Sequence, residues 1–261
     1  MTSTLPETSG TPKTSGNPET SGYPETSGYP EASALAATVE SLARRVDALE
    51  STLAIRNLQH AYGYYLDKTL YSEVVELFAE DCTVIFMNAV YRGKAGARRL
   101  YTGRFRSLFT DGRNGPMPGF LLDHPQMQDV VHIDDDGNHA HGRFRTLMQA
   151  GVHDSVEDPR KGRGRAKQWW EGGMYENEYV REDGVWKIRT LNYRPLWHGT
   201  FDDGWAHTPL DFVPSPNSLY PQDEFGADEI LQDDTRELWP NTAVMDFHYP
   251  HPVTGEPWKS S

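Results

Sequence analysis

The chain has 261 residues, of which 37% are hydrophobic and 24% charged, with 23 glycines and 18 prolines. This length suits one good-sized domain or two small ones, and the composition excludes a wholly disordered or collagen-like chain. The formal net charge of −13 disfavours general nucleic-acid binding, which draws on a basic surface. The single cysteine, Cys82, excludes an intramolecular disulfide framework and a multi-cysteine metal site.

The first 33 residues carry a repeat of the PETSG type, with a proline at every sixth position from Pro6 to Pro30. Such a segment has little apolar surface to offset its ordering entropy, so we expect residues 1–33 to be disordered. The N-terminus lacks the basic and apolar regions of a signal peptide, and no apolar run approaches the roughly 18 residues of a membrane span. A cytoplasmic protein that does not enter the membrane is expected.

A helix with an apolar seam is predicted for residues 34–53. Its large aliphatic side chains follow a 4-3-4-3-4 spacing, which is typical of a helix that packs against another helix. The partner can be the helix's own domain or a second chain, and we favour self-association into a dimer or trimer. The seam consists of Leu35, Val39, Leu42, Val46, Leu49 and Leu53.

Residues 54–200 show helix signals first and strand signals afterwards. The first helix continues to residue 67, short helices are predicted at 71–79 and 94–109, and a strand at 82–87 has a short return at 91–93. Four long strands follow, and glycines in Asp-Asp-Asp-Gly and Glu-Asp-Gly turns join them as hairpins. This order predicts an α+β fold with helices on one face of a curved antiparallel sheet. The long strands are predicted at 120–133, 139–152, 168–181 and 185–193.

Two further segments lie outside this pattern. Residues 201–261 lose periodicity and are acidic, yet they carry many aromatic side chains, so we expect an ordered extension or lid that wraps the domain or a neighbouring subunit. The basic run from Arg160 to Lys167 can be a phosphate or nuclear-targeting patch, but a solvated loop between two strands is favoured.

Three features are candidates for chemistry. Asp67 ends a helix beside several tyrosines, and His124 lies in an apolar strand where a polar ring needs a partner. Taken alone, Asp67 can cap the next helix and His124 can be a hydrogen-bonded core histidine. Alternation along residues 169–179 places Trp169, Glu171, Gly173, Tyr175, Asn177 and Tyr179 on one face, as plain packing or as a pocket wall where the glycine leaves room for a ligand.

The element order, the helix that ends in Asp67 and the segment from Tyr179 to Ile188 resemble the nuclear transport factor 2-like superfamily. The resemblance covers residues 54–200. It is strongest to the polyketide-cyclase-like branch, which includes scytalone dehydratase, hexachlorocyclohexane dehydrochlorinase and lignin diarylpropane formaldehyde lyases. It implies a conical barrel with a deep apolar pocket between the sheet and the helices.

The resemblance also implies site residues. Asp67 and His124 match an aspartate–histidine pair in which the histidine is the general base. Three departures limit the transfer: no second histidine occurs near Met148, Leu66 stands where the dehydratase has a tyrosine, and Tyr62 stands where the dehydrochlorinase has a lysine. The acid–base pair therefore transfers, but neither specific reaction does. The predicted substrate-binding residues are Tyr62, Tyr65, Phe86, Trp169, Tyr175, Asn177, Tyr193 and His198.

These residues predict a cofactor-independent lyase that abstracts a proton and eliminates water or formaldehyde from an aromatic substrate, with a lignin-derived two-ring compound favoured. Alternatives are an isomerase or cyclase with the same base, or a non-catalytic binding or scaffolding module. A metal site on the hairpin that carries His132, His139 and His141 is a weaker alternative, because its Asp-Asp-Asp-Gly sequence is ordinary turn chemistry. No cofactor, metal, nucleic acid or membrane partner is expected.

Overall fold

The computed structural model describes residues 32–158, 160, 166–210, 212–213, 216–232, 238–242 and 244–258. The chain divides into two compact units, Met1–Ala43 and Arg44–Ser261. Most of the N-terminal repeat lies outside the described residues, and its predicted disorder stays a prediction. In the described part of the chain, no helix is both long and apolar enough to cross a membrane.

The helix predicted to begin near residue 34 is α1, which runs from Ala32 to Asp67. Within the second unit, one of its faces is buried at Ser51, Ile55, Gln59, Tyr62 and Leu66. These positions recur every three or four residues, which is the spacing of one helix face. That face carries α1 into the main apolar core and places Asp67 at the end of a buried stripe.

The shorter helices surround one side of the core. α2 spans Tyr71–Glu76, and α3 (Gly93–Arg98), the π-helix η1 (Arg99–Phe105) and α4 (Arg106–Phe109) follow one another. The helix expected at 71–79 is shorter than predicted, because β1 (Phe78–Phe86) already begins at Phe78. Gly96 of α3 allows close packing, since a Cβ atom there would lie 2.8 Å from the Tyr91 carbonyl carbon.

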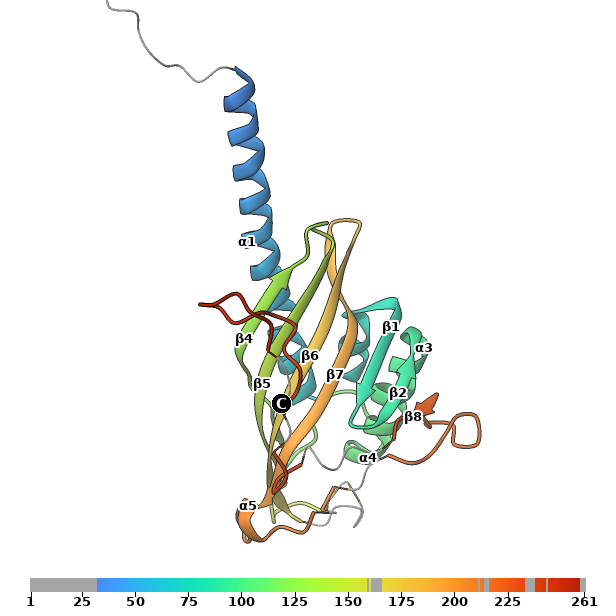
Figure 1. Ribbon diagram of the computed structural model, residues 1–261. Helices are drawn as coiled ribbons and strands as arrows, with labels where there is room; N and C mark the ends of the chain where they lie inside the picture. Colours follow the sequence, from blue (N-terminus) through green and yellow to red (C-terminus); the bar gives the residue numbers. More distant parts are fainter. Residues whose placement is uncertain are drawn as a thin grey trace, which may run out of the picture. The chain divides into compact units, whose positions relative to one another are not determined.

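The strands form one curved, open sheet (Figure 1). Its order is β3-β5-β6-β7-β1-β2-β8, and β4 also pairs with β5. The predicted α+β fold is confirmed, but the sheet is not antiparallel throughout, because β1 pairs with β7 in parallel. The remaining strands are β2 (Ala89–Arg92), β3 (Phe120–Asp123), β4 (Gln126–Ile133), β5 (His139–Val152), β6 (Gln168–Glu182), β7 (Val185–Thr200) and β8 (Glu229–Ile230).

The strand expected at 120–133 is interrupted at His124 and Pro125. Both β3 and β4 pair with β5, from Asp123 opposite Gln149 to Gln126 opposite Thr146, so the register is kept across the break. Proline has no N–H to donate to the ladder, which accounts for the interruption. The break lets the His124 side chain leave the sheet pattern and be buried.

The C-terminal segment wraps its own domain at several places. β8 pairs with β2 at the edge of the sheet. The backbone N–H of Trp239 donates to the backbone carbonyl of Leu196 on β7, at 2.7 Å. Arg143 of β5 donates to the Asp246 carbonyl and lies over the Phe247 ring. The segment also includes the short helix α5 (Gly204–His207). The described parts of residues 201–261 therefore contact the sheet, and an ordered extension or lid stays a prediction.

Candidate active site

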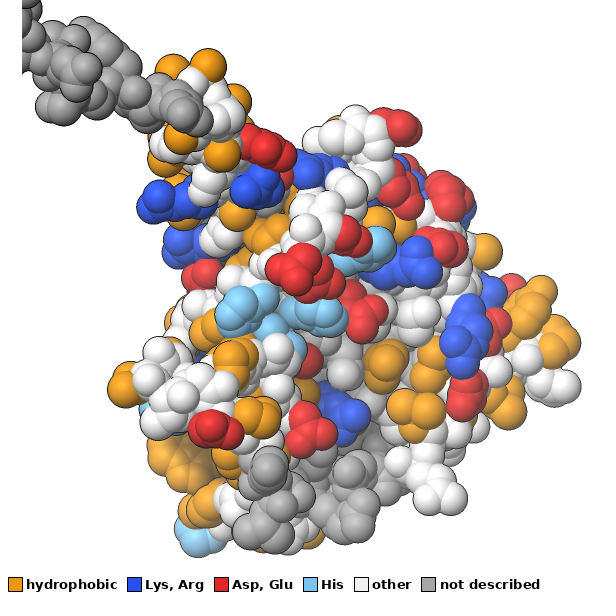
Figure 2. Space-filling view, turned by 45° about the horizontal axis from the view of Figure 1, so that its top comes forward, with side chains coloured by type: hydrophobic (Ala, Val, Ile, Leu, Met, Phe, Trp, Pro, Cys, Tyr) orange, Lys and Arg blue, Asp and Glu red, His pale blue; other side chains and the backbone are white. Residues whose placement is uncertain are grey.

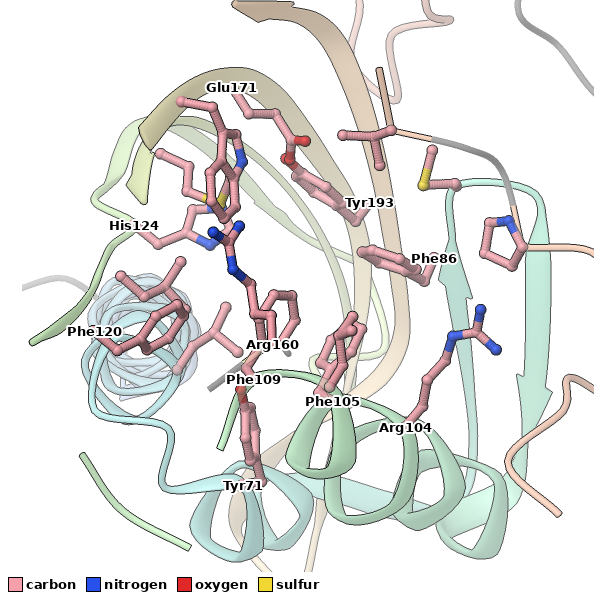
Figure 3. Close-up of a pocket in the computed structure, with 18 of the residues that line it drawn as sticks. Tyr71, Phe86, Arg104, Phe105, Phe109, Phe120, His124, Arg160, Glu171 and Tyr193 are labelled. Carbon is pink, nitrogen blue, oxygen red and sulfur yellow. The ribbon is translucent and has the colours of Figure 1, made fainter. Parts of the chain in front are cut away.

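A cavity of about 380 Å³ lies in the second unit between the sheet and the helices. Aromatic side chains from α2, η1, α4 and several strands converge on it, as Figure 3 shows for Tyr71, Phe86, Phe105, Phe109 and Phe120. Phe212 of the C-terminal segment completes the lining. The cavity is therefore largely apolar, and a few polar side chains reach it. These are Tyr62, Arg104, His124, Arg160, Glu171, Tyr175 and Tyr193.

His124 presents its ring to this cavity from the break between β3 and β4 (Figure 3). Its Nε2 atom lies 3.4 Å from the Tyr175 hydroxyl. Its Nδ1 atom is buried and has no hydrogen-bond partner among the described residues. Burial lowers the pKa of His124 to about 4, so the imidazole is neutral at pH 7 and able to accept a proton.

Asp67 lies behind His124 at the end of α1. Its carboxylate accepts a hydrogen bond from the backbone N–H of His124. Burial raises the pKa of Asp67 to about 6, and the nearby charge of Asp123 adds to this shift. The Oδ1 atom is buried and, like His124 Nδ1, finds no hydrogen-bond partner in the described part of the chain. The structure thus brings the carboxylate to the histidine residue, through its backbone and not through its ring.

Four buried tyrosines form a phenol cluster beside His124. The hydroxyls of Tyr62 and Tyr101 lie 3.0 Å apart, and the rings of Tyr175 and Tyr193 are 4.7 Å apart between centroids. Burial raises the pKa of Tyr62 to about 12 and raises the pKa values of the other three well above the usual range. All four hydroxyls are therefore protonated at pH 7 and can donate hydrogen bonds.

Glu171 places a carboxylate in the cavity wall. The Tyr193 hydroxyl donates to its Oε1 atom, and His198 Nε2 lies 2.6 Å from its Oε2 atom. Burial raises the pKa of Glu171, but the interactions with His198 and Tyr193 outweigh burial and hold the pKa below its ordinary value. Sequence reasoning placed Glu171 on the correct face of the strand but did not select it as a site residue.

Arg160 is a second residue that sequence reasoning missed. The sequence predicts that it lies in a solvated loop between two strands, but the Arg160 side chain is buried and lines the cavity. Asp158 binds it through two oxygens, with Arg160 Nη2 2.7 Å from Asp158 Oδ2, and its guanidinium lies over the Trp169 ring. These partners allow the charge to be buried. Residues 161–165 of the basic run lie outside the described residues.

Of the ten predicted site residues, six line the cavity: Tyr62, Phe86, His124, Trp169, Tyr175 and Tyr193. Asp67 and His198 lie behind lining residues, and Tyr65 packs half-buried at the core edge. Asn177 is buried away from the cavity, where its amide bonds to Gln59 and Tyr179 and its carbonyl accepts the Asn192 N–H. Its predicted place in a substrate-facing wall is therefore wrong.

One of the two interpretations of the Gly173 face is that the glycine leaves room for a ligand. A Cβ atom at this position would lie 2.4 Å from the Tyr193 hydroxyl, so the space is filled by that phenol.

On the histidine-bearing hairpin, His139 Nδ1 contacts Asp136 at 2.6 Å and His141 Nε2 lies 3.7 Å from Asp134. Within the described ranges, no group of three or more acidic, histidine or cysteine side chains could hold a metal ion.

The match to known families covers residues 47–192, which fit the SnoaL-like domain. This segment is more than half of the chain, and the protein belongs to the SnoaL-like domain family of the nuclear transport factor 2-like superfamily. The predicted superfamily is therefore confirmed. No curated protein matches the chain.

Two solved structures are similar to this chain at low sequence identity. A type 2 hexachlorocyclohexane dehydrochlorinase is 19% identical, with 60% of this chain and 93% of that chain covered and a TM-score of 0.47. A scytalone dehydratase-like protein from Novosphingobium aromaticivorans is 18% identical, with 65% and 97% covered and a TM-score of 0.46. The family assignment rests on the domain match, because similarity at this level says nothing about the reaction.

Proposed function

We propose that the protein is a cofactor-independent lyase in which His124 is the general base and Asp67 its positioning carboxylate. The observation that carries this proposal is a pair of unpartnered buried atoms. His124 Nδ1 and Asp67 Oδ1 have no partner among the described residues, and the carboxylate already holds the backbone of the same histidine. Leaving buried polar atoms unpaired costs about 1–3 kcal/mol each, so their retention favours a functional role.

The proposed base works as follows. When substrate occupies the cavity, Asp67 accepts the Nδ1 proton of His124, which leaves Nε2 as the acceptor that faces the substrate. The carboxylate then stabilises the imidazolium formed when Nε2 takes a proton. A positioned base of this kind contributes about 10²- to 10⁴-fold to the rate. Because burial lowers the pKa of His124 to about 4, the ion pair with Asp67 is needed to strengthen the base.

The phenol cluster suits the other half of an elimination. Departure of a hydroxide requires a proton donor, and the Tyr175 hydroxyl lies 3.4 Å from Nε2 on the same side of the cavity. Its raised pKa keeps the phenol protonated until a leaving group needs stabilisation. We assign Tyr175 to hydrogen bonding with the departing oxygen, which leaves His124 to take the first proton.

The cavity favours an aromatic substrate with more than one ring. Its volume lies within the range of small-molecule sites, about 300–1,000 Å³, and nearly half of its lining residues are aromatic. A 1,2-diarylpropane-1,3-diol fits this chemistry. His124 removes the proton of the terminal hydroxyl, the bond to the terminal carbon breaks to release formaldehyde, and the electron pair forms the alkene as the benzylic hydroxide leaves as water. Simple dehydration of an aromatic alcohol uses the same base and acid.

The test is a screen of aromatic alcohols and 1,2-diarylpropane-1,3-diols with the full-length protein. We expect a new conjugated double bond by absorbance, with formaldehyde in equal amount if the diol is cleaved. The His124→Ala variant should lose this activity, and His139→Ala, which removes an exposed histidine, is the matched control. An isomer of the substrate as product would replace the lyase assignment with an isomerase. Tight binding without turnover would indicate a binding module.

A further inference from the structure

Helix α1 has two apolar faces, and the domain uses one of them. In the second unit, Asp47 of α1 is paired with Arg181 at 2.8 Å, and Ser51 and Ile55 are buried in the same stripe. The other face carries Val46, Leu49 and Leu53, which are 51%, 67% and 56% exposed. Hydrophobic side chains are visible along the described part of α1 in Figure 2. The exposed hydrophobic residues recur at regular intervals along this face, unlike the isolated hydrophobic residues of an ordinary protein surface.

The spacing of this exposed face follows a heptad repeat. The d positions are leucines and the a positions are valine, valine and leucine, counted from the N-terminal end of α1. β-Branched residues at a with leucine at d favour two parallel strands. The dimer seam consists of d residues Leu35, Leu42 and Leu49 and a residues Val39, Val46 and Leu53, all at least half exposed.

The charges beside the dimer seam select the partner and its direction. Arg45 occupies a g position and Glu50 the e position of the next heptad, and both are exposed. In a parallel, in-register pair of helices, g contacts the following e of the other chain. Arg45 of each chain then faces Glu50 of the other, which gives two ion pairs. An antiparallel pair would instead bring e against e and g against g.

We propose that α1 forms a parallel, in-register, two-stranded coiled coil with α1 of a second copy of this chain. A second copy supplies both the complementary seam and the complementary charges without any other molecule. Tyr62 lies on the side of α1 opposite Leu53, and Asp67 lies on the seam side but at the end of α1, well beyond the last seam residue. Dimerisation through the dimer seam therefore leaves the proposed active site unchanged.

Charge exchange in the full chain tests the pairing. Arg45→Glu and Glu50→Arg each place two like-charge pairs beside the seam and should each weaken the dimer about tenfold, measured by sedimentation. An equimolar mixture of the two variants restores both ion pairs in a heterodimer and should recover the wild-type association. Turnover per chain should stay unchanged in all samples, so this test is independent of the proposed function.

A crosslinking experiment tests direction and register. In a parallel coil the two Leu49 side chains meet, so Leu49→Cys should give a disulfide-linked dimer on mild oxidation. Ser41→Cys, at an exposed position outside the seam, is the matched control and should stay uncrosslinked. Native Cys82 is buried and present in both variants. A wild-type monomer or trimer at micromolar concentration, no response to the charge variants, or no Leu49→Cys disulfide would overturn the proposal.

Discussion

Strand β6 carries two buried polar clusters that differ in how well they are satisfied. In the first, Asn177 donates to Gln59 at 3.0 Å, Tyr179 donates to Gln59 at 2.8 Å, and Gln59 donates onward to Gln126 at 2.7 Å. In the second, Tyr175 makes one long contact with His124, and the nearby Nδ1 of His124 and Oδ1 of Asp67 have no partner among the described residues.

The difference in hydrogen bonding distinguishes a structural cluster from a candidate functional cluster on the same face of β6. A fully satisfied buried network stabilises and orients a core, whereas a partly satisfied one has capacity left for a ligand. We therefore infer that the first cluster fixes α1 to the sheet and that the second cluster binds the substrate. Mutations should separate the two clusters into an effect on stability and an effect on turnover.

The largest expected effect is on turnover. His124→Asn keeps a polar side chain of similar reach but removes the base, and kcat/KM should fall about 10²- to 10⁴-fold. The free energy of unfolding should change by less than about 1 kcal/mol, because the replaced ring makes few hydrogen bonds. Urea unfolding and initial rates on the same preparations check both parts. A large loss of stability with retained turnover would place His124 in the structural cluster.

The next largest effect is on stability. Asn177→Ala leaves the half-buried Asn192 N–H without its acceptor and removes one of the two donors to the Gln59 carbonyl, so the free energy of unfolding should fall by about 1–3 kcal/mol. Turnover per folded molecule should stay within about threefold of wild type. Asn57→Ala, an exposed position on α1, is the control and should be nearly neutral in urea unfolding.

The pH dependence of turnover should follow Asp67. The carboxylate must be ionised to accept the Nδ1 proton, and its pKa is raised to about 6. Turnover should therefore be flat above about pH 7 and fall about tenfold per pH unit below about pH 6. Protonation of His124 itself, near pH 4, would steepen the loss at lower pH. An acid limb centred near pH 4 alone would remove Asp67 from the mechanism.

The smallest effect is a gain in stability. Because the pKa of Asp67 is higher in the folded chain than its usual 3.8, the ionised carboxylate destabilises the fold at pH 7 and the cost disappears as pH falls below 6. Asp67→Asn should raise the free energy of unfolding at pH 7 by about 1 kcal/mol, discounted for partial exposure, with less gain at pH 4.5. Exposed Asp135→Asn is the control in the same urea titrations.

Local patterns predicted most of the elements. Strand β5 begins and ends where alternation and the turn glycine place it, and the long helix α1 follows its apolar spacing. The parallel pairing of β1 with β7 was not predicted, because it joins segments far apart in the sequence. Pro125 could have indicated the strand break that exposes His124 to the cavity, since proline interrupts a ladder.

The candidate site was harder to predict than the fold. Alternation assigns residues to a face of β6 but does not say how far along the strand the cavity extends, so Asn177 was included and Glu171 left out. Arg160 is buried because Asp158 and the Trp169 ring fold back onto it, which no spacing in the sequence indicates. The grouping of Asp67 with His124 came from the family resemblance and not from their separation in the chain.

A double-mutant cycle tests the central claim most directly. With the substrate identified in the screen, kcat/KM is measured for wild type, Asp67→Asn, His124→Ala and the double variant. If Asp67 acts through His124, the losses are not additive, and the double variant should match His124→Ala within about twofold. If the two losses multiply in full, Asp67 and His124 act independently, and the proposed acid–base pair is contradicted.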